Sequence, residues 1–239
     1  MTWHSGAMSS WPVIAAINNA HWCDAVCQTH GIDTQSDDHL WTSRTRTPSL
    51  YPDAVTLVPD PSLHDLFARI DSSPGCSIKD SFASLDLTGH GFRLLFEAQW
   101  IARAPGEMQT VTTDVGWEVV TDVAGFAAWE RAWRGTNGAA GVLRPTLLGR
   151  PEATFLAAKV DQRIVAGAIL NRSVAAVGIS NFFVEASTTA QNRRGCVELA
   201  AALFSGTWLV GYVSGPLLDI ALTHGFEAVG PLRVWVLDT

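Results

Sequence analysis

Two adjacent arginines, Arg193 and Arg194, stand directly before Gly195 and Cys196, where a polar loop is predicted to lead into a helix. The unpaired N–H groups at a helix start, together with the helix dipole, attract phosphate groups. Guanidinium groups at the same point add charge-assisted hydrogen bonds to a diphosphate. These four residues therefore predict a pyrophosphate site, with solvated loop charges as the alternative explanation of the arginines.

The strand predicted just before this loop, residues 174–184, would complete such a site. A strand that splays from its neighbour exposes backbone groups to an extended ligand, and a loop and a helix start then follow it along the chain. Asn181 on this strand could donate or accept a hydrogen bond, or could stabilise a bulge. Only two tyrosines, Tyr51 and Tyr212, could supply a phenolic acid, and Tyr212 follows the predicted binding helix on the next strand.

Two other groups of residues could do chemistry. His21, Cys23, Cys27 and His30 offer soft ligands that suit zinc. A helix that buries Cys23 and Cys27 in a hydrophobic core is the alternative explanation of this pattern, because free cysteine is among the most buried residue types. Cys196 stands beside two arginines at a predicted helix start, which lowers a thiol pKa, but no histidine is adjacent in sequence to serve as its base.

The elements that must position these residues are clearest in the second half of the chain. Apolar periodicity, turn residues and caps predict the order β-α-loop-β-β-β-α-β-α-β there. The predicted strands are 117–121, 153–160, 163–170, 174–184, 207–214 and 229–237, and the helices follow Asp122, Arg194 and Pro216.

The first half has weaker patterning. Helices are predicted at 17–29, 62–70 and 81–87, and strands at 54–58, 76–79 and 93–102. The polar stretch 104–110, which contains Pro105 and Gly106, predicts a seam between two regions. The tripeptide His-Gly-Phe occurs at 90–92 and again at 224–226, each time before a predicted final strand. The matched order of elements around the tripeptides favours an internal duplication.

Residues 116–238 resemble the GNAT (GCN5-related) N-acyltransferase family. The resemblance is carried by the element order and by Gly225 and Phe226 before the last strand. It implies an α/β fold of the GNAT type, in which one sheet mixes parallel and antiparallel strands (an α+β mixed sheet). It also implies that the fold is built from two tandem halves. The halves would be a degenerate GNAT-like region at 1–110 and an acyltransferase domain at 115–239.

The resemblance also implies an activity and a site. The activity is acyl transfer, with acetyl-CoA as co-substrate and no metal, to a small-molecule or peptide amine. Glu185, at the end of the splayed strand, is the predicted base, and Tyr212 is the remaining candidate for the acid. The predicted acyl-CoA contacts are Phe182, Phe183 and Val184 along the pantetheine arm, and Arg193, Arg194, Gly195 and Cys196 at the pyrophosphate.

Two positions depart from the family pattern. If Gly195 is the first glycine of the family's loop, Val197 stands where the second is usual. Ala221 stands near the place where many members carry a tyrosine. These departures support a second hypothesis, a GNAT-like binding or interaction module that no longer performs catalysis.

Composition excludes several classes of function. The chain has 239 residues and a net charge of −7, and its lysines are only Lys79 and Lys159, so no basic cluster is present to bind nucleic acid. No apolar run approaches the roughly 20 residues that span a bilayer, and the first residues do not form a secretory signal. We therefore expect a cytoplasmic protein with reduced cysteines, and the oligomeric state stays open.

Overall fold

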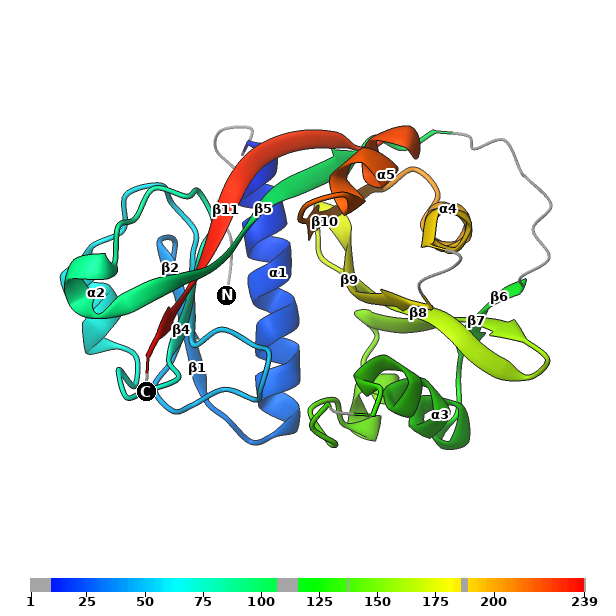
Figure 1. The fold of residues 1–239 in the computed structure, drawn as a ribbon, viewed down its shortest axis with the longest axis horizontal. Helices are drawn as coiled ribbons and strands as arrows, with labels where there is room; N and C mark the ends of the chain where they lie inside the picture. The colour runs from blue at the N-terminus through cyan, green and yellow to red at the C-terminus, as the bar shows by residue number, and fades with distance from the viewer. Residues whose placement is uncertain (1–9, 107–115, 137, 186–188, 239) are drawn as a thin grey trace.

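The computed structural model describes residues 10–106, 116–136, 138–185 and 189–238. Within these residues eleven strands form one mixed sheet, in the order β1-β2-β3-β4-β11-β5-β10-β9-β8-β7-β6 (Figure 1). This confirms the predicted α/β fold with a mixed sheet. The strands are β1 (Thr34–Ser36), β2 (Leu40–Ser43), β3 (Ala54–Thr56), β4 (Ser77–Asp80), β5 (Phe92–Arg103), β6 (Gly116–Val120), β7 (Ala153–Val160), β8 (Arg163–Arg172), β9 (Ala176–Val184), β10 (Trp208–Val213) and β11 (Glu227–Leu237).

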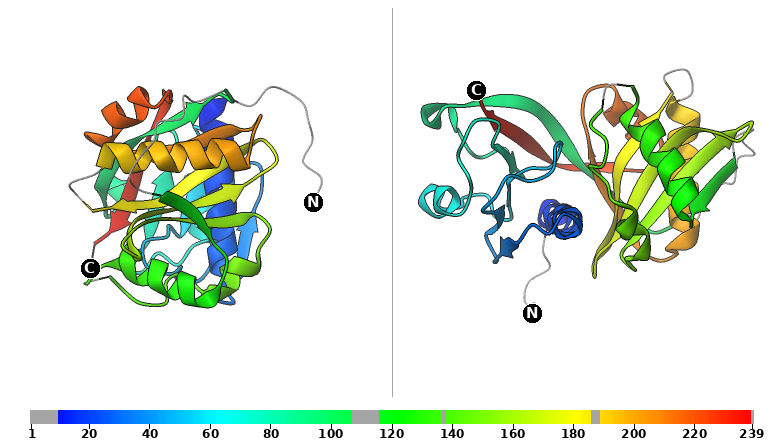
Figure 2. Two further views of the ribbon diagram at one scale, coloured as in Figure 1. Left: turned by 90° about the vertical axis from the view of Figure 1, so that its right-hand side faces the viewer. Right: turned by 90° about the horizontal axis from the view of Figure 1, so that it is seen from below.

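Helices cover both faces of the sheet. They are α1 (Trp11–Thr29), α2 (Leu63–Ala68), α3 (Val123–Arg134), α4 (Thr189–Leu203) and α5 (Leu217–Thr223), with 3-10 helices η1 (Thr88–His90) and η2 (Pro145–Gly149). Because alternate residues of a strand face opposite sides, Phe155 of β7 packs against Phe126 and Trp129 of α3, while the adjacent Leu156 belongs to the core cluster that contains residues of α4. Figures 1 and 2 show α3 and α4 on opposite faces of the strands between them. No helix in the described part of the chain is long and apolar enough to cross a bilayer.

The two longest strands, β5 and β11, lie side by side at the centre of the sheet. They pair antiparallel over nearly their whole length, from Phe92 opposite Leu237 to Ala102 opposite Glu227. On its other side β5 pairs with β10, and β11 pairs with β4. Each predicted half therefore contributes a central strand that joins the sheet of the other, and the sheet is continuous across the predicted seam.

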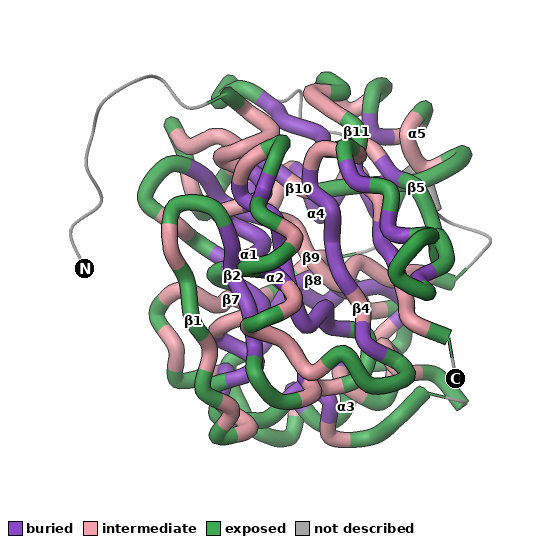
Figure 3. The backbone as a smooth tube through the Cα atoms, turned by 90° about the vertical axis from the view of Figure 1, so that its left-hand side faces the viewer, coloured by how far each residue is buried: buried purple, intermediate pink, exposed green. Residues whose placement is uncertain are grey.

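Helix α1 lies between the two halves of the sheet, where it contacts β9, β5 and β11 (Figure 1). Trp22, Cys23 and Val26 are almost fully buried there. The tube in Figure 3 shows the same distribution across the molecule, with buried segments in the interior and exposed segments in the outer turns. The helix begins at Trp11, earlier than predicted, because Pro12 fits a first turn, where no N–H is needed.

Two buried asparagines bind α1 to the β8–β9 hairpin. The Asn18 amide donates to the Asn171 and Ala176 carbonyls at 3.0 and 3.3 Å. The Asn171 amide donates in return to the backbone and side-chain oxygens of Asn18 at 3.0 and 2.7 Å, and Ser180 donates to Asn171 at 3.0 Å. Because each polar group has a partner, this network fixes α1 against β9 in one register.

Several sequence expectations are wrong in detail. Helix α4 begins at Thr189 and not at Gly195. The helix predicted at 81–87 is absent, and the short η1 follows it instead. Strands β1 and β2 were not predicted, since each has only three or four residues. The last residues of the predicted seam lie outside the described part of the chain.

Replacing Asn171 with alanine should lower the free energy of unfolding by about 1 to 3 kcal/mol, because it removes the donor to the buried Asn18 Oδ1 and the acceptor of the Ser180 hydroxyl, while the Asn18 amide keeps its backbone partners. Urea denaturation followed by circular dichroism measures this. Gln191→Ala is the matched control, since Gln191 is exposed on α4 and its loss should change stability by less than about 0.5 kcal/mol. Equal effects of the two substitutions would contradict the structural role of the network.

Candidate functional site

Strands β9 and β10 pair for only three residues and then separate. The parallel pairing runs from Ala176 opposite Trp208 to Gly178 opposite Val210. Both strands continue beyond this point, β9 to Val184 and β10 to Val213, without pairing with each other. The strand predicted to splay does so, and its backbone groups on the side of β10 are left outside any ladder.

A β-bulge in β9 accompanies the separation. Gly167 of β8 lies opposite Phe183 and Ile169 opposite Ser180, so Asn181 and Phe182 share one partner residue. Asn181 adopts a left-handed backbone with φ of 52°, which asparagine tolerates better than most residues. A bulge bends the strand that carries it and increases the local twist. The bulge therefore directs the end of β9 away from β10.

A cavity of about 480 Å³ opens at this separation. Ile179, Asn181 and Phe182 of β9 and Gly211 and Tyr212 of β10 form its middle. The side of α4 and α5 adds Arg193, Leu217 and Phe226, and the first half of the chain adds Asn19, Trp22, Cys23, Tyr51 and Lys79. The two halves of the sequence therefore build one cavity together.

Arg193 is the cation on the α4 side of this cavity. It lies in the second turn of α4 and is only 7% exposed. Its guanidinium stacks over the Phe182 ring, with the central carbon 4.4 Å from the ring centroid. The Nε atom has no hydrogen-bond partner, and no described carboxylate forms an ion pair with the side chain. Burial lowers the pKa of Arg193, which is the cost of holding a cation there without a counter-charge.

The Asn181 side chain joins β9 to the first half of the chain. Its Oδ1 atom accepts hydrogen bonds from Trp22 Nε1 at 3.0 Å and from the Tyr51 hydroxyl at 3.4 Å. Burial raises the pKa of Tyr51 well above its ordinary value, so this hydroxyl stays protonated and can donate. Asn181 was predicted either to contact a substrate or to stabilise a bulge, and the structure places it both in the bulge and in the cavity wall.

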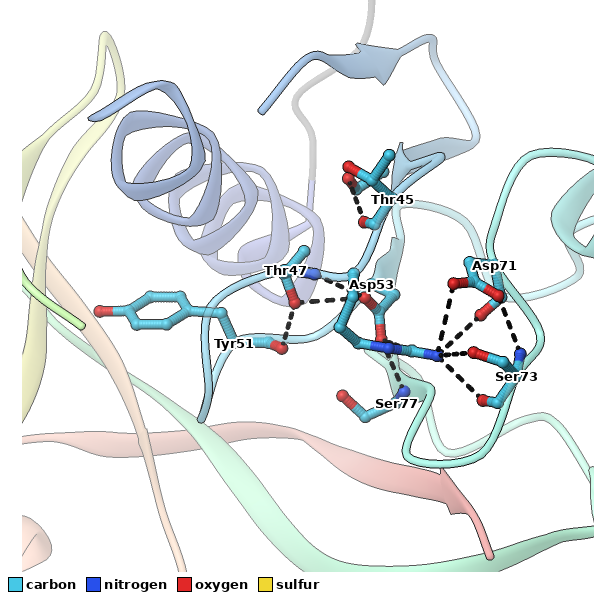
Figure 4. Close-up of polar contacts among 9 residues, drawn as sticks. Thr45, Thr47, Tyr51, Asp53, Asp71, Ser73 and Ser77 are labelled. Atoms are coloured by element: carbon cyan, nitrogen blue, oxygen red, sulfur yellow. Dashed lines mark hydrogen bonds and ion pairs between the residues drawn. The ribbon is translucent and has the colours of Figure 1, made fainter. Parts of the chain in front are cut away.

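A buried carboxylate holds the segment that carries Tyr51. Asp53 accepts from the Thr47 and Ser77 backbone N–H groups, both at 2.9 Å, and from Arg46 at 2.6 Å. Thr47 also donates to the Tyr51 carbonyl at 2.7 Å. Figure 4 shows the Tyr51 ring directed away from this network. Asp53 therefore positions Tyr51 without being part of the cavity wall.

Tyr212 of β10 and Lys79 of β4 are in contact in the cavity wall. The Lys79 ammonium lies over the Tyr212 ring, 4.3 Å from its centroid, and donates to Asn19 Oδ1 at 2.7 Å. Trp100 contacts the edge of the same ring at a centroid distance of 5.6 Å. Tyr212 is 38% exposed, whereas Lys79 is 4% exposed. The predicted acid thus lies in the cavity wall, beside Lys79, which no local sequence pattern marks as a site residue.

Other predicted site residues lie elsewhere. Phe183 faces the opposite side of β9 and packs against Trp129 at a centroid distance of 5.2 Å, while Val184 packs with the Ala158 cluster. Glu185 is exposed and ion-paired with Arg163. None of these three predicted residues is part of the cavity wall.

The predicted pyrophosphate residues are also separated by the structure. Because α4 begins at Thr189, the positions from Arg193 to Cys196 lie inside the helix. Arg194 pairs with Glu198 one turn later. Gly195 lies against Trp117, where a Cβ atom would come within 2.5 Å of the indole ring, so packing explains this glycine. Of the four, only Arg193 reaches the cavity.

The cysteines show no sign of nucleophilic or metal-binding roles. All four are buried free thiols. Burial raises the pKa of Cys196 and of Cys27 to about 12, and that of Cys23 to about 11, so these thiols are protonated near neutral pH. No described group of three or more histidine, cysteine or carboxylate side chains is arranged to hold a metal, so the zinc alternative at His21 to His30 is not formed.

Three solved structures resemble the chain over nearly its whole length. A GCN5-related N-acetyltransferase from Kribbella flavida has a TM-score of 0.62 at 16% identity, covering 95% of this chain and 96% of that one. A putative GNAT-family acetyltransferase from Novosphingobium aromaticivorans has a TM-score of 0.55 at 14% identity, covering 94% and 99%. A GCN5-related N-acetyltransferase-like protein from Streptococcus suis has a TM-score of 0.54 at 14% identity, covering 95% and 98%.

No family model matches the sequence, and no curated protein matches it. At identities of 14 to 16%, likeness between structures establishes a shared fold. The element order, the parting of β9 and β10 and these whole-chain similarities agree on the same architecture. The chain has the fold of the GNAT acyl-CoA N-acyltransferases.

Proposed function

We propose that the protein is an acyl-CoA-dependent N-acyltransferase that uses acetyl-CoA and acts on a small-molecule or peptide amine. The observation that carries the proposal is the cavity at the point where β9 and β10 part. The fold supports it, because the three similar structures are described as acetyltransferases or as like them.

The residues present fit an acyl-CoA. Beyond Gly178 the β9 edge that faces β10 offers unpaired backbone donors and acceptors to the amides of a pantetheine arm. Phe182 supplies an apolar wall, and Arg193 supplies a buried cation with an unpartnered Nε for a phosphate. The proposal assigns the phosphate contact to Arg193, because Arg194, Gly195 and Cys196 do not line the cavity; a contact from these three stays a prediction.

Acyl-CoA, when bound, supplies an acyl carbon activated as a thioester. Transfer forms a bond from the acceptor nitrogen to that carbon and breaks the carbon–sulfur bond; the nitrogen loses a proton to water, and the sulfur gains one. The Tyr212 phenol, in the cavity wall, is the proposed donor of the proton to sulfur and regains it from solvent, to which the ring is partly exposed. Glu185 remains a prediction for the base; because its carboxylate is paired with Arg163 outside the cavity wall, it would act only through water.

The tandem arrangement is also a proposal, with domains at 1–110 and 115–239. Its support is the symmetry of the sheet order about the β11–β5 pair. On each side an antiparallel pair (β4–β11 and β10–β5) is followed by a parallel pair (β3–β4 and β9–β10) and then by antiparallel pairs. The two His-Gly-Phe tripeptides lie at similar positions, one ending at the first residue of β5 and the other directly before β11. A cytoplasmic location belongs to the same proposal and is supported by the free cysteines.

One observation favours the second candidate, a GNAT-like module without catalytic activity. Gly195 packs against the Trp117 ring, so this glycine does not provide an exposed turn that a phosphate could approach. Such a module would keep the fold and the contact between the halves, and it would not bind acetyl-CoA.

Replacing Arg193 with leucine should weaken acetyl-CoA binding by about 10- to 100-fold, because one charge-assisted contact to a phosphate is lost. Isothermal titration calorimetry measures this. Arg194→Leu is the matched control on the same helix and should change affinity by less than about twofold, since Arg194 pairs with Glu198. Thermal stability of Arg193→Leu should not fall, because the buried cation has no carboxylate partner among the described residues. Absence of binding by the unmodified protein would reject the enzyme and leave the module.

Replacing Tyr212 with phenylalanine should lower kcat by about 100-fold with little change in KM, because only the proton donor is removed. Release of free thiol from acetyl-CoA in the presence of a panel of primary amines measures the rate. Glu185→Gln should retain kcat within about threefold, since its exposed ion pair lies outside the cavity wall. A large loss in Glu185→Gln with an active Tyr212→Phe would reverse the two roles.

A further inference from the structure

The cavity wall has a charge opposite to that of the chain as a whole. The sequence carries a net charge of −7, with 23 acidic and 16 basic residues. Among the described residues that line the cavity, the charged ones are Lys79 and Arg193, and no aspartate or glutamate lines it. A cavity with this lining favours an anion and disfavours a multiply charged amine.

Lys79 is the cation on the side of the cavity away from α4. Lysine is almost never fully buried unless it is paired, because removing an ammonium group from water costs free energy that a partner must offset. Lys79 is 4% exposed, and no described carboxylate forms an ion pair with it. Its partners are the neutral oxygen of Asn19 and the face of the Tyr212 ring. An ammonium has three donors, and a ligand anion would complete its surroundings.

The mouth of the cavity on this side is apolar. Leu50, Leu95 and Phe96 line the cavity and are 82%, 48% and 36% exposed, so they offer apolar surface to a ligand there. Leu50 also holds a left-handed backbone, with φ of 75°, which a leucine adopts only when its surroundings require it. A ligand that reaches Lys79 from this mouth would bury an apolar group against these side chains.

The geometry points to an acceptor of the amino-acid class, an amine that also carries a carboxylate and an apolar side chain, with Lys79 as the residue that binds the carboxylate. This inference rests on the proposed acyl transfer. Arg193 would bind a phosphate of the acyl donor on the α4 side of the cavity. Lys79 would bind the carboxylate of the acceptor on the Tyr212 side. Because Lys79 contacts the Tyr212 ring, an acceptor held by it lies beside the proposed acid.

The absence of a carboxylate from the described wall also suits the chemistry. The acceptor nitrogen attacks only as the free amine, and a nearby positive charge disfavours the ammonium form. Lys79 therefore both holds the acceptor and lowers the pKa of its amino group, while a carboxylate in the same place would stabilise the ammonium.

The test compares each amino acid with the amine formed by removing its carboxylate: L-leucine with 3-methylbutylamine, and L-phenylalanine with 2-phenylethylamine. Binding is measured by isothermal titration calorimetry without acyl-CoA, and transfer is measured with acetyl-CoA. The unmodified protein should prefer the amino acid of each pair. Lys79→Met should weaken amino-acid binding by about tenfold or more and leave the amines nearly unchanged, because only the amino acid loses a charged contact.

Lys159→Met is the matched control, since Lys159 is the only other lysine in the chain and pairs with Glu118 on the far edge of the sheet. Lys79→Arg keeps the charge and should retain the preference, which separates a loss of recognition from a loss of folding, as does a thermal melt of each variant. Equal or tighter binding of the amines, or no binding of either amino acid at about 10 mM, overturns the inference.

The two proposals fail separately. Binding of acetyl-CoA without binding of the amino acids leaves the acyltransferase and rejects the acceptor class. Binding of the amino acids, lost in Lys79→Met, without binding of acetyl-CoA confirms the anion site and rejects the acyl transfer.

Discussion

The parting of β9 from β10 is the constraint on which the rest of the structure depends. Hydrogen bonding alone would continue a parallel pair to the ends of both strands, yet this pair stops at Gly178 and Val210. The bulge at Asn181 bends β9, and the Asn181 side chain is held by Trp22 and Tyr51 from the first half of the chain. The opening is therefore fixed by partners more than 100 residues away, and it is a built feature of the fold.

Electrostatics and packing divide the cavity into two regions. Arg193 lies with Phe182 on the α4 side, and Lys79 lies with Tyr212 on the side of the first half. Each cation is buried and lies over the face of an aromatic ring, and this contact offsets part of the free energy cost of removing the charge from water. Neither is paired with a described carboxylate, so no counter-charge from the described residues competes with an anionic ligand. A chain that is acidic overall thus encloses a cationic interior suited to an anionic donor and an anionic acceptor.

The sequence predicts the elements of the second half well because each has local signals. The Asp122 side chain accepts from Gly125 N–H and caps α3, and Asp161 and Gln162 adopt the left-handed turn between β7 and β8. The start of α4 was misplaced because Gly195 reads locally as a boundary, whereas it is a close contact with Trp117, a residue of β6. Lys79 and Tyr51 were not selected as site residues because their roles depend on long-range pairing: β4 meets β11 only in the folded sheet, and Asn181 lies 130 positions from Tyr51. The splayed strand was predicted from the sequence, and Phe182, Arg193 and Tyr212, which were selected from the element order, line the cavity, while their roles stay predictions.

Amide hydrogen–deuterium exchange along β9 tests the central claim most directly. The β9 amides that face β8 are already in a ladder, whereas those that face β10 beyond Gly178 are not. If an acyl-CoA lies between the two strands, saturating acetyl-CoA should slow exchange in residues 179–184 and 211–213 and leave the β7–β8 hairpin unchanged. Unchanged exchange in these two segments, under conditions where acetyl-CoA binds, would show that the ligand lies elsewhere and would contradict the account.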